Sequence, residues 1–246
     1  GTVTGTGGDT EAGDSFGICT GDTTAVDSVQ LTIQNATVTA TGGAAPSGNS
    51  SGIFATNTIA DVEVTIENAA VTATGGTAGT GSSYGILAET TGTDKSAEVT
   101  INGNSVVRAN MTGAEGGDGE TISGTTVNRE SGIIFENGVG TVYGTVTLRE
   151  DLTVGADERL TIPRGATLTI PEGKTLTNSG VITNEGTLTN NGTLTIGQGG
   201  ALTGNVNGNP VIYAVTVLTD GNGTASASPA TAAAGTAITL TASPNS

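Results

Sequence analysis

The chain has 246 residues, of which 41 are Gly and 2% are aromatic, and it contains no His and no Trp. Seven Lys and Arg against 23 Asp and Glu give a formal net charge of -16, which repels phosphate backbones and anionic membrane surfaces. We therefore expect no nucleic-acid partner. Because no apolar run reaches about 18 residues, and no basic and then apolar leader precedes Gly1, we also expect no membrane insertion.

The missing residue types exclude several kinds of active site. Without His, a Ser/His/Asp triad, a Cys/His dyad and a zinc site with imidazole ligands cannot form. Cys19 is the single cysteine, so we expect neither an intrachain disulfide bond nor a multi-cysteine metal site. We interpret Cys19 as a small buried core residue rather than a reactive thiol.

Internal repeats dominate the first half of the chain. Residues 31–43 read LTIQNATVTATGG and residues 64–76 read VTIENAAVTATGG, displaced by 33 positions. A weaker third copy, VTINGNSVVRAN, covers 99–110 and is displaced by a further 35. A Ser close to a Gly-Ile pair marks a second strand before each copy and once more after the third: Ser15, Ser50, Ser83 and Ser131. Such periods are typical of solenoids.

Within each copy apolar and polar residues alternate, the two-residue period of a strand that buries one face. In the first copy we expect Leu31, Ile33, Val38 and Ala40 to face inward, and Thr32, Thr39 and Thr41 to face outward. Stacked coils place equivalent aliphatic side chains above one another, and each one buried contributes about 1.5 to 3 kcal/mol. The repeats therefore predict an all-β fold, a right-handed parallel β-helix with Gly and Asn at its corners and inserted Gly-rich loops.

The second half has a shorter period. Eight residues separate the first aliphatic positions and six separate the later ones: Leu152, Leu160, Leu168, Leu176, Ile182, Leu188 and Leu194. Three faces per turn give coils of about 24 and then about 18 residues. From Tyr213 two longer alternating strands flank a turn at 220–223, where Asp-Gly signals a hairpin, and a third run follows at 237–242.

These features predict three parts. Residues 1–138 form a β-helix with coils of about 33 to 35 residues and inserted loops, residues 139–212 form a β-solenoid with shorter coils, and residues 213–246 form a short, truncated β-sandwich-like segment.

Several of these residues resemble known surface-protein repeats. The VTATGG copies with the preceding LTIQNA and VTIENA are similar to repeats of secreted surface proteins of anaerobic gut bacteria, and LTIPRGATLTIPEGKTLTNSGVITNEGTLTNNGTL resembles the solenoid segments that follow in such proteins. The tail from Tyr213 resembles the opening of an internalin-type B repeat, a β-domain used in tandem as a spacer on cell surfaces. The resemblance implies an extracellular protein, secreted or anchored to the cell surface, and assigns no catalytic or binding residue.

A carbohydrate-active enzyme needs clustered carboxylates, often with Lys or Arg that stabilise developing charge. The candidates are two acidic pairs and three nearby arginines: Glu150, Asp151, Asp157, Glu158, Arg149, Arg159 and Arg164. Sequence neighbours on a strand face opposite sides, so neither pair makes a dyad by itself. We interpret this group as a surface salt-bridge cluster rather than a catalytic groove.

Calcium binding is a second alternative, because calcium takes oxygen ligands from acidic loops. The segment GAEGGDGE at 113–120 offers Glu115, Asp118 and Glu120, and a second acidic stretch covers 9–14. We interpret both as solvated loops and predict no metal site and no cofactor, with a structural calcium ion as the alternative.

Threonine pairs suggest a third alternative, an ice-binding face. Thr39 with Thr41 and Thr72 with Thr74 stack in the expected register. The third copy is expected to place Val107 and Ala109 at these positions, so that the array ends after two coils. Exposed strand positions also favour β-branched Thr in general, and we interpret the array in that way.

Sugar recognition usually relies on exposed aromatic rings. The six aromatic residues are Phe16, Phe54, Tyr84, Phe135, Tyr143 and Tyr213. Phe16 and Tyr84 each precede a Gly-Ile pair, so we expect them at one place on successive coils, as structural residues, with sugar stacking as the alternative.

Together these observations predict a non-enzymatic extracellular stalk or adhesin module of a bacterial surface protein, without catalytic residues. Its ligand-binding residues are not assigned, but inserted loops on one side are where binding to a host or environmental glycan or protein surface is expected. The alternative is a carbohydrate-binding module or a carbohydrate-active β-helix protein of the lyase or hydrolase type.

Overall fold

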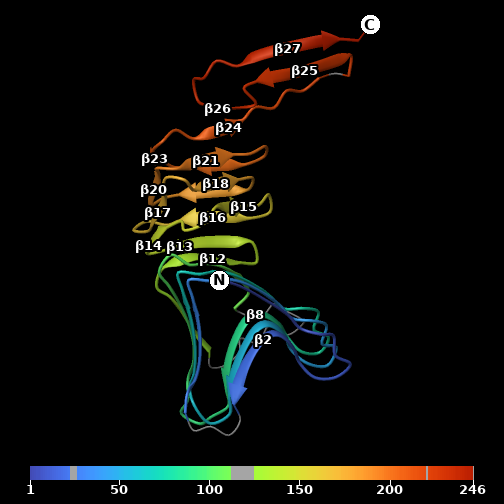
Figure 1. Ribbon diagram of the computed structural model, residues 1–246, viewed down its shortest axis with the longest axis vertical. Coiled ribbons are helices and arrows are strands. Elements are labelled where there is room, and N and C mark those ends of the chain that lie inside the picture. Colours follow the sequence, from blue (N-terminus) through green and yellow to red (C-terminus); the bar gives the residue numbers. More distant parts are fainter. Residues whose placement is uncertain (23–26, 112–124, 220, 246) are drawn as a thin grey trace. The chain divides into compact units, whose positions relative to one another are not determined.

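The computed structural model describes residues 1–22, 27–111, 125–219 and 221–245. These residues form strands, turns and loops without a helix, which confirms the all-β prediction (Figure 1). The chain divides into two compact units, unit 1 (Gly1–Val146) and unit 2 (Thr147–Ser246).

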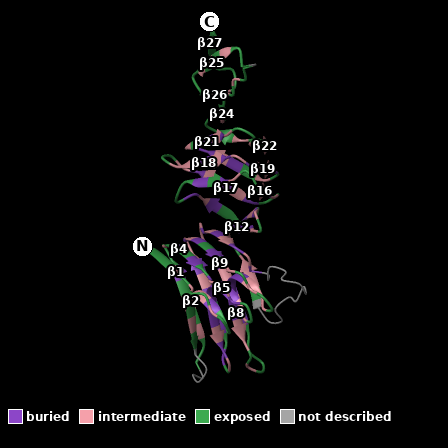
Figure 2. Ribbon diagram, turned by 90° about the vertical axis from the view of Figure 1, so that its right-hand side faces the viewer, coloured by how far each residue is buried: buried purple, intermediate pink, exposed green. Residues whose placement is uncertain are grey.

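Unit 1 is a stack of parallel coils, as the repeats predict. Each of the first three coils supplies one strand to each of three sheets, so strands about 33 residues apart lie side by side (Figure 2). The first sheet contains β1 (Thr2–Thr6), β4 (Thr37–Thr41), β7 (Ala70–Thr74) and β10 (Val106–Ala109); the second β2 (Ser15–Asp22), β5 (Ser50–Asn57) and β8 (Ser83–Thr90); the third β3 (Val29–Gln34), β6 (Val62–Glu67), β9 (Ala97–Asn102) and β11 (Thr125–Arg129).

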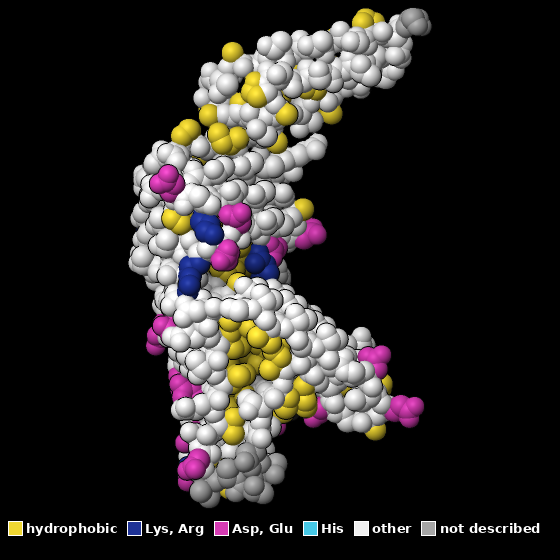
Figure 3. Space-filling view, viewed as in Figure 1, with side chains coloured by type: hydrophobic (Ala, Val, Ile, Leu, Met, Phe, Trp, Pro, Cys, Tyr) yellow, Lys and Arg dark blue, Asp and Glu magenta, His cyan; other side chains and the backbone are white. Residues whose placement is uncertain are grey.

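The strand register confirms the length of the repeats. Leu31 pairs with Val64, 33 positions on, and Val64 pairs with Val99, 35 positions on. The neighbouring inward residues Ile33 and Ile66 also pair, with exposed fractions of 7% and 0%. Stacking of equivalent aliphatic residues therefore builds the core, and hydrophobic side chains gather at the centre of unit 1 in the space-filling view (Figure 3).

Asn and Gly make the corners between the third and the first sheet, as predicted. Asn35 and Asn68 have positive φ angles of 50° and 49°, and Gly103 of the third copy has a φ of 67°. The third corner is one residue longer than the second. Val64 and Val71 are seven positions apart, whereas Val99 and Val107, which pair with them in the next coil, are eight positions apart.

This extra residue overturns one expectation. Val107 and Ala109 do not take the outward positions of Thr72 and Thr74; they pair with the inward residues of β7 and are buried, with exposed fractions of 0% and 5%. Arg108 pairs with Thr72 instead. A one-residue shift turns every side chain of a strand to its other face.

The prediction from the fourth Ser and Gly-Ile signal, a further strand of the second sheet after Ser131, is also wrong. The strand after Ser131, β12 (Gly132–Glu136), does not extend the β2–β5–β8 sheet but pairs in parallel with β10 in the first sheet. It then forms an antiparallel hairpin with β13 (Val139–Tyr143). Asn137 and Gly138 both have positive φ angles, the turn geometry that reverses a chain into a hairpin.

The Ser and the Gly of the three Ser and Gly-Ile signals that mark β2, β5 and β8 have structural roles. A Cβ atom added to Gly52 would lie 2.6 Å from the backbone N of Thr74, so only glycine lets β5 approach the first sheet so closely. The Ser50 hydroxyl donates to the Gly43 carbonyl oxygen and accepts from the Gly76 amide, both at 2.7 Å. One buried hydroxyl thus joins two successive inserted loops.

The inserted loops are themselves stacked. The amide of Ala45 donates to the carbonyl oxygen of Thr77 at 2.8 Å, and Ala45 forms a parallel bridge with Ala78. These loops continue the coil-to-coil ladder rather than bulging freely from it.

Beside the main core, a second small cluster lies on the β2–β5–β8 sheet, made of Phe16, Phe54, Tyr84 and Leu87.

Unit 2 has shorter coils. Leu152 pairs with Leu176, 24 positions on, and Leu176 with Leu194, 18 positions on, which confirms the predicted coil lengths. Its coils contain β15 (Leu152–Val154), β16 (Arg159–Ile162), β17 (Thr167–Ile170), β18 (Thr175–Asn178), β19 (Val181–Asn184), β20 (Thr187–Asn190), β21 (Thr193–Ile196), β22 (Ala201–Thr203), β23 (Asn207–Gly208) and β24 (Ile212–Ala214), and β14 (Thr145–Thr147) lies at the boundary between the units.

Three buried asparagines hold the last coil. Asn178, Asn184 and Asn190 occupy inward positions that Val or Ile takes one coil earlier. Their side-chain amides donate to backbone carbonyl oxygens of the next coil, at 2.7, 2.6 and 3.1 Å respectively. The apolar core thus gives way to a layer of polar side chains that bind the following coil directly.

The tail pairs differently from the prediction. β25 (Gly223–Ser228) pairs with β27 (Thr239–Pro244), and β24 pairs with β26 (Thr231–Ala233), both antiparallel. The residues just before the turn at 220–223 therefore do not form a hairpin with β25, and Asp220 itself lies outside the described residues. The partner of β25 is decided by six long-range residue pairs, which a local turn signal does not encode.

Candidate functional site

The acidic pairs of unit 2 are engaged in local bonds. Asp151 accepts a hydrogen bond from the Thr175 amide at 2.8 Å, and Glu150 forms an ion pair with Lys174 at 3.4 Å. Glu158 accepts from the amide of Gly155, at 2.9 Å, within a turn. These carboxylates therefore stabilise turns and successive coils.

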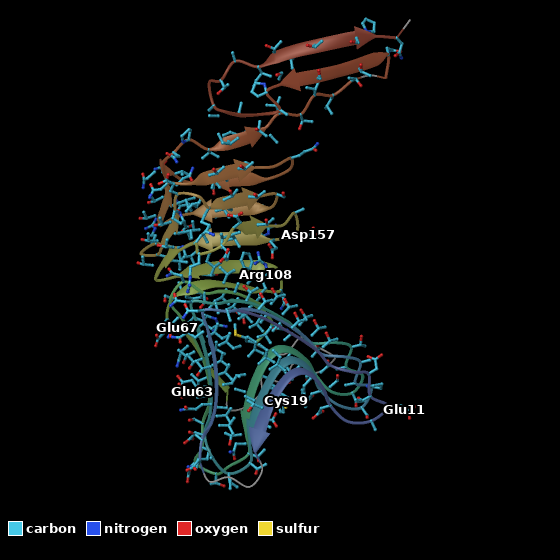
Figure 4. The ribbon with its side chains drawn as sticks, in the orientation of Figure 1. Glu11, Cys19, Glu63, Glu67, Arg108 and Asp157 are labelled. Atoms are coloured by element: carbon cyan, nitrogen blue, oxygen red, sulfur yellow. The ribbon has the colours of Figure 1, made fainter. Side chains whose placement is uncertain are left out.

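The remaining members of that group lie on the surface. Asp157, which Figure 4 labels, is exposed, and so are the three arginines Arg149, Arg159 and Arg164.

The acidic stretch 9–14 also has a structural role. Asp9 accepts a hydrogen bond from the amide of Ala44 at 2.8 Å, and Asp14 accepts from the amide of Asn49 at 2.7 Å. Both carboxylates therefore bind the next coil, while Glu11 is exposed (Figure 4). Across the described ranges no group of three or more acidic, His or Cys side chains converges on a metal position.

The other calcium candidates, Glu115, Asp118 and Glu120, lie outside the described residues.

The aromatic residues pack mainly against one another. Phe16 stacks on Phe54 with ring centroids 4.3 Å apart and an interplanar angle of 10°. Phe16 and Tyr84 share one strand position, as predicted, but they lie two coils apart rather than on successive coils, because Ser51 of the coil between them pairs with both. Phe54 and Tyr84 are buried, with exposed fractions of 8% and 5%, so little ring surface is left for a sugar.

The last three aromatic residues lie elsewhere. Phe135 is buried under the guanidinium group of Arg108, 4.3 Å from the ring centroid, and Tyr143 packs against the main core. Tyr213 is exposed, at 43%.

Cys19 is not the buried core residue that the sequence suggests. It is exposed on β2, where it pairs with Phe54 of β5. Partial burial raises the pKa of the Cys19 thiol, which disfavours the reactive thiolate form.

Threonines form the most regular surface of unit 1. Strand β1 adds a third coil to the array expected from the sequence, because Thr4 pairs with Thr39 and Thr6 with Thr41. We call the following six residues, all exposed, the threonine face: Thr4, Thr6, Thr39, Thr41, Thr72 and Thr74. The signal that could have revealed the third row is the Thr-Gly-Thr at 4–6.

Comparison with known proteins adds no relative. The chain matches no sequence profile of a known protein family, no curated protein and no solved structure. In the part of the chain that the structure describes, no helix has the length and apolar character needed to cross a membrane.

Proposed function

We propose that this chain is a non-enzymatic module of an extracellular surface protein, serving as a stalk or an adhesin. The observation that carries the proposal is the use of polar side chains for bonds between coils. Ser50, Asp9, Asp14 and Asp151 each bind the backbone of a neighbouring coil. A stack tied together by side chains as well as by strand pairing suits a structural element outside the cell.

The arrangement of the loops supports a role as an adhesin. The loops at 42–49 and 75–82 lie one above the other and are joined by backbone bonds. A ladder of loops held by a rigid scaffold is a common place for binding residues. The partner we propose is a glycan or a protein surface of the host or the environment.

The test is retention of the purified chain on mucins, host glycans and plant polysaccharides, with and without calcium, while released sugar is measured. Saturable retention without sugar release supports an adhesin, and absence of retention supports a stalk. Release of sugar would overturn the non-enzymatic proposal in favour of a carbohydrate-active protein.

A matched pair of variants locates any binding. Ser47→Glu combined with Thr80→Glu changes two exposed loop residues, whereas Thr32→Glu changes an exposed residue on β3. If the loops bind, the loop variant loses retention and Thr32→Glu keeps it. Equal loss in both would place binding away from the loops.

A further inference from the structure

The threonine face lacks charge in a strongly acidic chain. The neighbouring sheet of the same coils carries Glu63, Glu67 and Glu98 at outward positions, and Figure 4 shows Glu63 and Glu67 pointing outward. Both sheets have the same preference for β-branched residues at exposed positions. That preference therefore does not explain why the outward positions of one face hold threonine and one alanine, Ala70, over three coils while the other face has glutamate.

The hydroxyl groups of this face are available to water. Within the described residues, no hydrogen bond to another protein group involves the side chain of any of the six threonines. A threonine hydroxyl can both donate and accept, and the inward residues between them, such as Val38 and Ala73, fix the backbone by burial. The six hydroxyl groups thus form a rigid array whose hydrogen-bond donors and acceptors are available to water.

The spacing of the array is close to that of a tetrahedral water lattice. Adjacent strands are about 4.8 Å apart, and alternate residues on one strand are about 6.6 Å apart. In water joined by hydrogen bonds of about 2.75 Å with tetrahedral angles, second-neighbour oxygens lie about 4.5 Å apart and the repeat across the stacked layers is about 7.3 Å. Both spacings of the protein array agree with the lattice to within about a tenth.

We propose that the threonine face binds ice. Charged side chains would hold water in their own hydration shells, whereas uncharged hydroxyl and methyl groups at lattice spacing let water keep its tetrahedral bonds. The face ends at Arg108, which pairs with Thr72 and lies over the ring of Phe135. Because the array is three strands deep, the expected activity is inhibition of ice recrystallisation with a small thermal hysteresis.

The experiment measures ice recrystallisation and thermal hysteresis for the 246-residue chain and two substituted chains. Thr39→Lys places a long charged side chain at the middle of the face, in β4. Thr32→Lys makes the same change at an exposed threonine of β3, in the same coil. Melting curves establish that each variant is folded, and Thr72→Lys replaces Thr39→Lys if the latter is not.

The expected result is ice activity in the parent chain and in Thr32→Lys, and its loss in Thr39→Lys or Thr72→Lys. Absence of activity in the parent chain overturns the proposal. Equal loss in Thr32→Lys, or undiminished activity in a folded Thr39→Lys, also overturns it, because binding would then not involve the threonine face.

Discussion

The hydroxyl group of Ser50 shows how much one residue does in this fold. It is fully buried and holds one loop as a donor and the next as an acceptor. Ser15 repeats the arrangement one coil earlier, where it donates to Gly8 and accepts from the amide of Gly43. A column of serines therefore ties the loops to the sheet.

Replacing Ser50 with alanine should destabilise unit 1 by about 1 to 3 kcal/mol, because the partly buried Gly43 carbonyl and Gly76 amide lose their partner. Urea unfolding followed by circular dichroism measures the change. Ser47→Ala, at an exposed position in the same loop, is the control and should leave the midpoint unchanged. A Ser50→Ala midpoint equal to that of the control would contradict the role of the hydroxyl.

Glu89 is a residue whose charge opposes folding. Burial, and then the Asp14 carboxylate, raise the pKa of the half-buried Glu89 side chain. A carboxyl group with a raised pKa in the folded state binds protons more tightly there than in the unfolded chain. Stability is therefore highest while the group is protonated, and it falls as the pH rises through the window between the unfolded and folded pKa values.

Glu89→Gln should consequently stabilise the protein at neutral pH, and this gain should disappear below the ordinary pKa of glutamate, about 4.3. Urea midpoints at neutral and at acidic pH test this, with Glu11→Gln, an exposed site, as the control. A gain that persisted unchanged at acidic pH would show that relief of charge is not its cause.

At the scale of elements, glycine decides how closely the sheets approach. Gly17, Gly52 and Gly85 share one position of β2, β5 and β8, and an added Cβ atom at each would lie 2.8 Å or less from atoms of the first sheet or of the next coil. The middle glycine is enclosed on both sides by neighbouring coils, so its surroundings have the least room to shift.

Gly52→Ala should therefore destabilise unit 1 by about 1 to 3 kcal/mol through overpacking. Gly8→Ala provides the comparison, since an added Cβ atom there meets nothing within 4 Å and its φ is not positive. Thermal melting of the two variants measures the difference. Similar melting temperatures for both would mean that the sheets can separate without cost.

At the scale of the whole molecule, repulsion between like charges opposes folding. Ion pairs such as Lys95 with Asp61, Arg129 with Glu136 and Lys174 with Glu150 neutralise some of the 23 acidic side chains, but with seven Lys and Arg in the chain most carboxylates keep their charge. The remaining carboxylates repel one another through water, an effect that salt screens.

Raising NaCl from about 0.05 to about 0.5 M should therefore raise the melting temperature, because the screening length falls from above 10 Å to below 8 Å. KCl should act equally. A fall in melting temperature would contradict net self-repulsion. A larger rise with CaCl2 at matched ionic strength would instead reveal bound calcium.

Much of the architecture could be predicted because it follows from short periodic patterns in the sequence. The 33-residue displacement, the inward Ile33 and Val38, the corner at Asn35 and the 24 and 18 residue coils of unit 2 all follow from stacking equivalent residues. Strand alternation and turn chemistry depend on neighbouring residues, so a single chain displays them directly.

The candidate sites were less predictable, because a site depends on which segments meet. The sequence of 246 residues by itself determined a charged, parallel, coil-built molecule whose exposed strand positions carry threonine. Only the tertiary structure decided that β1 adds Thr4 to the array, that Cys19 is exposed, and that the longer corner at Gly103 turns Val107 inward. The reason is that register is fixed by hydrogen bonds between distant strands, where one inserted residue reverses the faces.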